Sequence, residues 1–192
     1  MKTIKMYLLA AGPLAFVAFT LGVLVSASQN TWWSLIRNAF SDLGGPRATN
    51  PWIFNWTLII SGILYILYSM GVLAYSRSRL DSFSAGLLFT AGIFLALIGV
   101  YPSGTRPHTF VSTWFYIQSL LGISVLGLSF LLQRKRQTGI ILLGLGVSAI
   151  PLAYLVHVTV GWPSVAILEL AGAIFILAAA ITHMVSVILS KE

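Results

Sequence analysis

The stretch Tyr7–Ala27, YLLAAGPLAFVAFTLGVLVSA, decides the class of fold. It contains no charged residue, and about 20 apolar residues suffice for an α-helix to cross the hydrocarbon core of a membrane. Of all 192 residues, 58% are hydrophobic and 8% are charged, and the mean hydropathy is +0.94. Soluble domains carry about 25% charged residues, and a membrane β-barrel would show alternating segments of about ten residues. The sequence therefore predicts an all-α integral membrane protein.

Five further apolar blocks follow, each ended by charged or turn-forming residues. They predict a bundle of six transmembrane helices. A cleaved signal peptide is the alternative for the first block, since Val25-Ser26-Ala27 resembles a cleavage site. We expect a span there, because the apolar run is longer than a usual signal core. The predicted spans are 7–27, 52–75, 82–100, 108–132, 139–156 and 164–189.

The basic residues predict the orientation of the bundle. Six spans place both termini on one side of the membrane, and only Arg37, Arg47 and Arg106 then lie on the other side. Because basic residues are retained on the cytoplasmic side, we expect a multi-pass protein of the cell membrane with cytoplasmic N- and C-termini. The residues expected on the cytoplasmic side are Lys2, Lys5, Arg77, Arg79, Arg134, Lys135, Arg136 and Lys191.

The stretch Thr31–Arg47, TWWSLIRNAFSDLGGPR, is the longest segment that is not uniformly apolar. Its large apolar residues share one face of a helical wheel, and its polar residues share the other. We therefore expect an amphipathic helix at 31–43, lying along the membrane surface between the first two spans and ended by Gly44-Gly45-Pro46. Asp42 would lie at the negative end of that helix dipole and would need a partner. We expect the helix to act as a lid, with Asp42 directed toward His108 or an arginine.

Polar residues gather on the predicted outer side. Glu169 lies about 8 Å inside the sixth span, at about 1.5 Å per residue. An acid within a span costs about 2.5–3.5 kcal/mol on insertion scales and usually faces the bundle interior or a cavity. We therefore expect an outward-facing polar cavity. Its candidate ligand-binding residues are Arg37, Ser41, Asp42, Arg47, Asn55, Arg106, His108, His157 and Glu169.

Several kinds of chemistry fit this set. A divalent metal such as zinc could be held by His108, His157, Asp42 and Glu169. The same side chains could instead form a proton-transfer pair or an ion-pair network, and each histidine could have a purely structural, interfacial role. The chain has no cysteine, which excludes thiolate ligands, thiolate nucleophiles and disulfides. We expect no haem, because neither His108 nor His157 lies deep in the bundle. No catalytic residue is assigned.

Short motifs resemble those of a known family. They are Asn38-Ala39-Phe40-Ser41-Asp42-Leu43-Gly44 after the first span, Asn50 to Asn55 at the start of the second, and Gly99-Val100-Tyr101-Pro102 followed by His108. Together they are similar to the six-span membrane proteins of the domain-of-unknown-function 998 family, over nearly the whole chain. This resemblance implies six spans and no assigned reaction. Ser41, Asp42, Gly44 and His108 also resemble positions of the Frag/DRAM/Sfk membrane family, some members of which act in lipid-anchor remodelling or lipid handling.

The leading functional hypothesis is a cavity that binds a lipid headgroup or another amphiphile, with membrane lipids as partners and the outer arginines suited to a phosphate. One alternative is a metal-dependent lipid hydrolase or transferase that activates water near Glu169. Others are a non-catalytic subunit of a larger membrane complex or a small transporter, and the chain could also form a homo-oligomer. A transporter needs a polar path across the membrane, and we expect few polar side chains in the inner half beyond Gln118, Ser119 and His183. Nothing in the sequence resembles a nucleic-acid-binding module.

Overall fold

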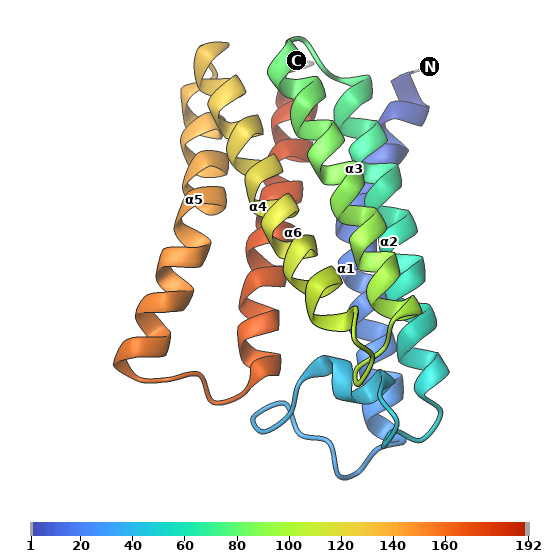
Figure 1. The fold of residues 1–192 in the computed structure, drawn as a ribbon. Helices are drawn as coiled ribbons and strands as arrows, with labels where there is room; N and C mark the ends of the chain where they lie inside the picture. The colour runs from blue at the N-terminus through green and yellow to red at the C-terminus, as the bar shows by residue number, and fades with distance from the viewer. Residues whose placement is uncertain (1, 191–192) are drawn as a thin grey trace.

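The computed structural model describes residues 2–190, and this part of the chain forms six long α-helices and one short 3₁₀ helix (Figure 1). Each of the six is long and apolar enough to cross a membrane, so the prediction of an all-α protein with six such helices is confirmed. The side chains of Lys2 and Lys191, expected on the cytoplasmic side, lie outside the part that is described. The elements are α1 (Lys2–Ser28), η1 (Phe40–Gly44), α2 (Pro51–Ala74), α3 (Arg79–Val100), α4 (His108–Leu132), α5 (Arg136–Thr159) and α6 (Val165–Leu189).

The helix bounds differ from the predicted spans mainly at polar ends. The predicted span 108–132 coincides with α4, whereas α3 begins before the predicted residue 82 and α5 extends beyond 139–156 at both ends. At the start of α3, Ser78 Oγ accepts the N–H of Asp81 at 3.1 Å, and Asp81 Oδ2 accepts the N–H of Ser78 at 3.1 Å. This reciprocal capping starts the helix in a polar stretch that hydropathy does not detect.

The helices pack largely in sequence order. α2 packs against α1 and α3, and α4 packs against α3 and α5. α6 contacts α1, α4 and α5 and thereby closes the bundle. In Figure 1 the start of α1 and the end of α6 lie at one end of the bundle, together with the α2–α3 and α4–α5 connections. We call this the basic end, because it carries Lys5, Arg77, Arg79, Arg134, Lys135 and Arg136. The other end, which carries η1 and the α3–α4 and α5–α6 connections, is the η1 end.

Glycines bring α2 and α3 into close contact. A Cβ atom added to Gly62 would lie 2.7 Å from the carbonyl oxygen of Gly92, too close for an unstrained contact. A Cβ atom added to Gly92 would lie 2.9 Å from the backbone nitrogen of Ile66. Lipid tails are as apolar as the helices, so this association depends on close van der Waals packing, which small residues permit.

The segment between α1 and α2 is not the predicted helix. Residues 31–43 form turns followed by the start of η1, so the prediction of an amphipathic surface helix is wrong. Hydrogen bonds from side chains to the backbone hold the segment instead of the backbone hydrogen bonds of a helix. Asn38 Oδ1 accepts the N–H of Ser34 at 2.9 Å, and Trp33 Nε1 donates to the carbonyl oxygen of Ala39 at 2.8 Å. Such bonds compete with the regular hydrogen bonds of a helix.

Asn30 joins the two ends of this segment. It is 1% exposed, and its Oδ1 accepts the N–H of Thr49 at 2.7 Å. Its Nδ2 donates to the carbonyl oxygens of Ser26 at 2.9 Å and Thr49 at 3.2 Å. A buried amide bonded in this way holds the backbone tightly. The segment 31–48 is therefore a loop anchored at both ends across the η1 end of the bundle (Figure 1).

Candidate functional site

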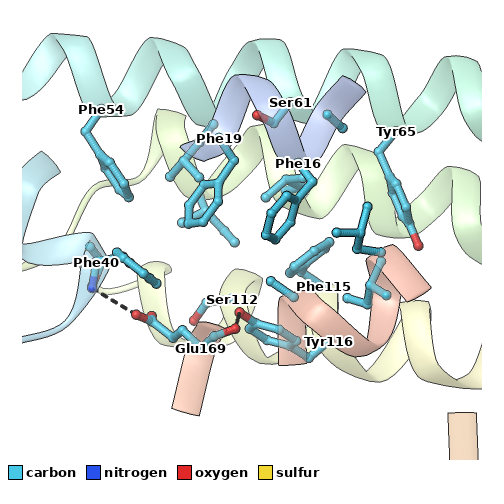
Figure 2. A pocket seen from close by; sticks show the side chains of 18 of the residues that line it. Phe16, Phe19, Phe40, Phe54, Ser61, Tyr65, Ser112, Phe115, Tyr116 and Glu169 are labelled. Carbon is cyan, nitrogen blue, oxygen red and sulfur yellow. Dashed lines mark hydrogen bonds between the residues drawn. The ribbon is translucent and has the colours of Figure 1, made fainter. Parts of the chain in front are cut away.

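A cavity lies toward the η1 end, lined by residues of α1, η1, α2, α3, α4 and α6 (Figure 2). It contains about 830 Å³ free of protein atoms, including the space at its mouth. Of this, about 100 Å³ is available to the centres of water-sized molecules, and a single water needs roughly 10–15 Å³ on that measure. The cavity therefore has room for a group much larger than one water, such as part of an alkyl chain.

Aromatic rings form much of the cavity wall. The ring centroid of Phe19 lies 5.2 Å from that of Phe40 and 6.4 Å from that of Phe54, both in edge-to-face geometry. Figure 2 shows Phe16 and Phe115 farther along the same cavity. Aromatic side chains have few rotatable bonds and present large apolar surfaces. The wall is therefore a rigid surface suited to an apolar group.

Glu169 is the acid of this cavity and lies near η1. Its Oε2 accepts the N–H of Phe40 at 2.9 Å, and its backbone carbonyl accepts the hydroxyl of Tyr116 at 3.0 Å (Figure 2). The other carboxylate oxygen, Oε1, accepts no hydrogen bond from the described residues. The inward orientation expected for Glu169 thus occurs, with a backbone N–H as its partner. One oxygen remains available as an acceptor.

His108 and two serine hydroxyl groups add to the polar lining near Glu169. His108 Nδ1 lies 2.8 Å from the carbonyl oxygen of Tyr101. A carbonyl can only accept, so Nδ1 donates this bond, and Nε2 has no hydrogen-bond partner among the described residues. Ser41 and Ser112 also line the cavity. Of these two, Ser112 donates its hydroxyl to the carbonyl oxygen of Thr109 at 3.1 Å.

The start of α6 holds residues 31–44, the first part of the 31–48 loop, beside the cavity. Ser164 Oγ donates to the carbonyl oxygen of Leu35 at 2.6 Å while accepting the N–H of Ile167 at 3.1 Å. The N–H of Ala166 donates to the carbonyl oxygen of Asn38 at 2.9 Å. The first N–H groups of a helix have no partner within it, so the segment satisfies donors of α6. Together with the Glu169–Phe40 bond, these contacts fasten η1 to α6.

The structure brings some of the predicted ligand-binding residues together. Ser41, His108 and Glu169 all line the cavity, and Asn55 lies next to it, where its Nδ2 donates to the carbonyl oxygen of Gly44 at 3.1 Å. Asp42 does not pair with His108 or an arginine, so that expectation is wrong. Its Oδ2 instead accepts the N–H of Ala39 at 2.9 Å and caps η1. The local backbone satisfies this carboxylate because the helix that would have carried it does not form.

The three arginines expected on the outer side are not part of the cavity lining. Arg37, Arg47 and Arg106 are exposed. The guanidinium of Arg47 lies 4.6 Å from the ring centroid of Trp32, which accounts for its position. A phosphate held by these three side chains inside the cavity is therefore not supported.

The predicted metal-ligand set is not assembled. His157 is exposed on α5 and is not among the lining residues of the cavity. Within residues 2–190 there is no group of three or more His, Asp or Glu side chains that could hold a metal ion. The cause is the position of α5, which packs mainly on α4 at the edge of the bundle (Figure 1).

Sequence reasoning missed two polar residues deeper in the cavity. Ser61 and Tyr65 of α2 are 1% and 4% exposed, and neither side-chain oxygen has a hydrogen-bond partner in the described structure. Residues four apart share one face of a helix. A pair of polar-tipped side chains at this spacing within an apolar span is the sequence signal that could have identified them.

The half of the bundle toward the basic end, which we expected to be the inner half, is also more polar than predicted. Asp81 is 3% exposed near the basic end and accepts hydrogen bonds from Ser129 Oγ at 2.6 Å and Gln133 Nε2 at 3.1 Å. The expectation that this half holds little beyond Gln118, Ser119 and His183 is therefore wrong. The capping pair Ser78 and Asp81 was the available signal.

Comparison with known proteins identifies the family of this chain. The family described as "Protein of unknown function (DUF998)" matches residues 10–186, which is most of the chain. No curated protein and no solved structure is significantly similar to it. The resemblance noted from the motifs around residues 38–44 and 99–108 is thereby confirmed. The chain, a six-helix membrane protein with an aromatic cavity beneath a fastened loop, belongs to the DUF998 family.

Proposed function

We propose that this protein binds one amphiphile in the aromatic cavity, with the apolar body among the phenylalanine rings and a hydrogen-bond-donating headgroup at Glu169. The observation that carries the proposal is the lining. It is mostly apolar and aromatic, and acceptor groups lie at the η1 end. Small-molecule sites typically combine an apolar wall with a few polar groups that orient the ligand.

The polar groups favour a headgroup that donates hydrogen bonds. Oε1 of Glu169 is an acceptor without a partner among the described residues, and Nε2 of His108 also has none. The oxygens of a phosphate would meet further acceptors there, and the exposed arginines lie outside the lining. A long-chain alcohol or amine therefore fits this end better than a phosphate.

The deeper part of the cavity offers a second polar contact. The hydroxyl groups of Ser61 and Tyr65 are buried and have no hydrogen-bond partner in the described structure. Buried polar atoms are nearly always hydrogen-bonded in native structures. A polar group within the ligand body, or a water molecule beside it, would satisfy them.

The orientation of the bundle is part of the same proposal. Lys5 and five arginine or lysine residues in or directly after the α2–α3 and α4–α5 connections lie at the basic end, while Arg37, Arg47 and Arg106 lie toward the η1 end. This asymmetry favours a cytoplasmic basic end and an outward-facing cavity. The chain has no cysteine, so single-cysteine variants can be labelled selectively. A membrane-impermeant maleimide should label Thr105→Cys and not Arg79→Cys in intact cells, and the reverse pattern would invert the orientation.

A matched ligand series tests the binding proposal. Protein in phosphatidylcholine nanodiscs is titrated with an alcohol, an amine and a phosphate of the same long alkyl chain, in competition with a fluorescent fatty amine. Glu169→Gln retains an acceptor for the Phe40 N–H but replaces the free acceptor by a donor. We expect this variant to bind the amine about tenfold or more weakly, as for the loss of a charge-assisted hydrogen bond.

The control for charge is Asp42→Asn, which removes a nearby carboxylate whose hydrogen bond is to Ala39 rather than to the cavity. It should leave the dissociation constant of the amine within about twofold of the wild-type value, because this carboxylate does not contact the ligand. The proposal fails if the alkyl phosphate binds best. It also fails if Glu169→Gln and Asp42→Asn weaken amine binding equally.

A further inference from the structure

A second cavity lies at the basic end, between the end of α2, the start of α3 and the ends of α4 and α6. Its polar lining includes Arg77, Asp81, Gln133, Lys135 and His183. It contains about 460 Å³ free of protein atoms, of which about 50 Å³ is available to the centres of water-sized molecules. That is the space of roughly three to five waters, which is comparable with one compact polyatomic ion.

The carboxylate of this cavity is fully occupied by donors. Asp81 accepts the N–H groups of Arg77 at 2.8 Å and Ser78 at 3.1 Å, the hydroxyl of Ser129 at 2.6 Å, and the amide of Gln133 at 3.1 Å. An ionised carboxylate has about four lone-pair sites. Asp81 is therefore satisfied by neutral groups of α4 and of the α2–α3 and α4–α5 connections rather than by a cation.

Two cations, Arg77 and Lys135, also line this cavity. Neither Arg77 nor Lys135 forms an ion pair with any of residues 2–190. Lys135 Nζ lies 5.1 Å from the ring centroid of Phe130, a contact that leaves its hydrogen-bond donors free. Burial lowers the pKa of Lys135, the charge of Arg77 lowers it further, and Asp81 opposes both effects. An anion bound beside Lys135 and Arg77 would offset both the burial of the Lys135 charge and its repulsion by Arg77.

His183 provides an independent indication of a ligand. It is 2% exposed and lies among rings, with centroids 5.7 Å from Phe130 and 6.2 Å from Tyr68 in edge-to-face geometry. Its Nδ1 has no hydrogen-bond partner in the described structure. A buried imidazole nitrogen without a partner is uncommon, and this one belongs to a side chain that lines the cavity.

We propose that the basic-end cavity binds a phosphate group, with Arg77 and Lys135 as charge partners and the buried His183 as a further hydrogen-bond partner. Guanidinium and ammonium groups supply several strong donors to phosphate oxygens, and the size of the cavity matches one such group. The phosphate is that of inorganic phosphate or of a phosphomonoester lipid headgroup. This site is separate from the aromatic cavity and does not depend on the function proposed for it.

The test uses the full-length chain in phosphatidylcholine nanodiscs, prepared without phosphate. One arm measures binding of radiolabelled inorganic phosphate, and the other measures retention of phosphatidic acid by native mass spectrometry. Lys135→Gln is compared with Arg136→Gln, which removes the same charge from an exposed neighbour outside the cavity lining. We expect Lys135→Gln to weaken binding at least about tenfold and Arg136→Gln by less than about twofold, because only the former removes a direct donor.

A second variant, Arg77→Gln, keeps the proposal testable if Lys135→Gln fails to yield folded protein, because the Arg77 side chain is exposed. Circular dichroism and size-exclusion chromatography establish that each variant is folded. Binding of inorganic phosphate alone identifies a free anion, and retention of phosphatidic acid alone identifies a lipid headgroup. Either outcome supports the site. Absence of binding in both arms, or equal losses for Lys135→Gln and Arg136→Gln, would overturn it.

Discussion

The bond between Glu169 and the backbone of Phe40 is predicted to hold the 31–44 segment against α6. The Glu169→Ala substitution removes the acceptor 2.9 Å from the Phe40 N–H, and Phe40 is only 5% exposed. Leaving a buried backbone donor without a partner costs about 1–3 kcal/mol. At about 1.4 kcal/mol per factor of ten, the segment should open about 5 to 140 times more often.

Hydrogen exchange measured by mass spectrometry provides the assay, since amide exchange reports local opening. The peptide that covers residues 36–44, in nanodiscs, should exchange faster in Glu169→Ala by that factor. Glu169→Gln should exchange at close to the wild-type rate, because its side-chain carbonyl can still accept the N–H of Phe40. A peptide from the middle of α2, residues 58–68, is the internal control and should be unchanged in both variants.

Two results would refute this reasoning. If Glu169→Ala leaves exchange of residues 36–44 unchanged, the bonds from Ala166 and Ser164 to the loop are sufficient to hold it. If Glu169→Gln and Glu169→Ala accelerate exchange equally, the negative charge holds the segment rather than the hydrogen bond. Faster exchange of the α2 peptide as well would indicate a loosened bundle instead of an opened loop.

Three further contacts can be tested by substitution, two of them with a matched control variant. Each effect on stability is measured as the change in the thermal unfolding midpoint in detergent. Asp42→Ala removes the cap of η1 and should destabilise by about 1 kcal/mol, whereas Asp42→Asn should retain most of the bond; equal loss in both would contradict a hydrogen-bonded cap. Gly62→Ala should destabilise by about 1–3 kcal/mol because its Cβ meets the backbone of α3, whereas Gly86→Ala, where such an atom meets nothing within 4 Å, should not destabilise. Asp81→Ala leaves four donors without their acceptor and should destabilise by about 3 kcal/mol, and a midpoint within error of the wild type would mean that water replaces the carboxylate.

The membrane-spanning architecture was predictable because it depends on local properties of the chain. A lipid environment offers no partners to the backbone, so each span must satisfy its own N–H and C=O groups as a helix. Apolar length alone therefore located all six helices, and α4 has the predicted bounds. The family assignment was likewise predictable from the short motif around Ser41 and Asp42, and the match over residues 10–186 confirmed it.

The prediction of a helix at 31–43 was wrong because it used only the spacing of the apolar residues. The spacing of apolar residues does not show that the side chains of Asn38 and Asp42 bond to the backbone within the segment. Nor does it reveal Asn30, which ties residues 26 and 49 together. Whether these side chains bond to the backbone or the segment forms a helix depends on the tertiary surroundings of each side chain.

The candidate site was likewise predictable only in part. The sequence alone identified Glu169 as an inward-facing acid, because a charged group within a span cannot face lipid at low cost. Its partner is the backbone of Phe40, which lies 129 residues away in the chain. Nothing in the composition or spacing of either segment indicates that pairing.

The sequence by itself thus determined the number, length and class of the helices, because the membrane imposes those requirements on each span separately. Only the tertiary structure decided which polar residues share a cavity. It left His157 exposed on α5, kept the outer arginines outside the aromatic cavity, and placed Lys135 and His183 together in the basic-end cavity. The physical reason is that helix packing and long-range hydrogen bonds set the rotation and spacing of the helices, and these depend on close contacts between residues far apart in the chain.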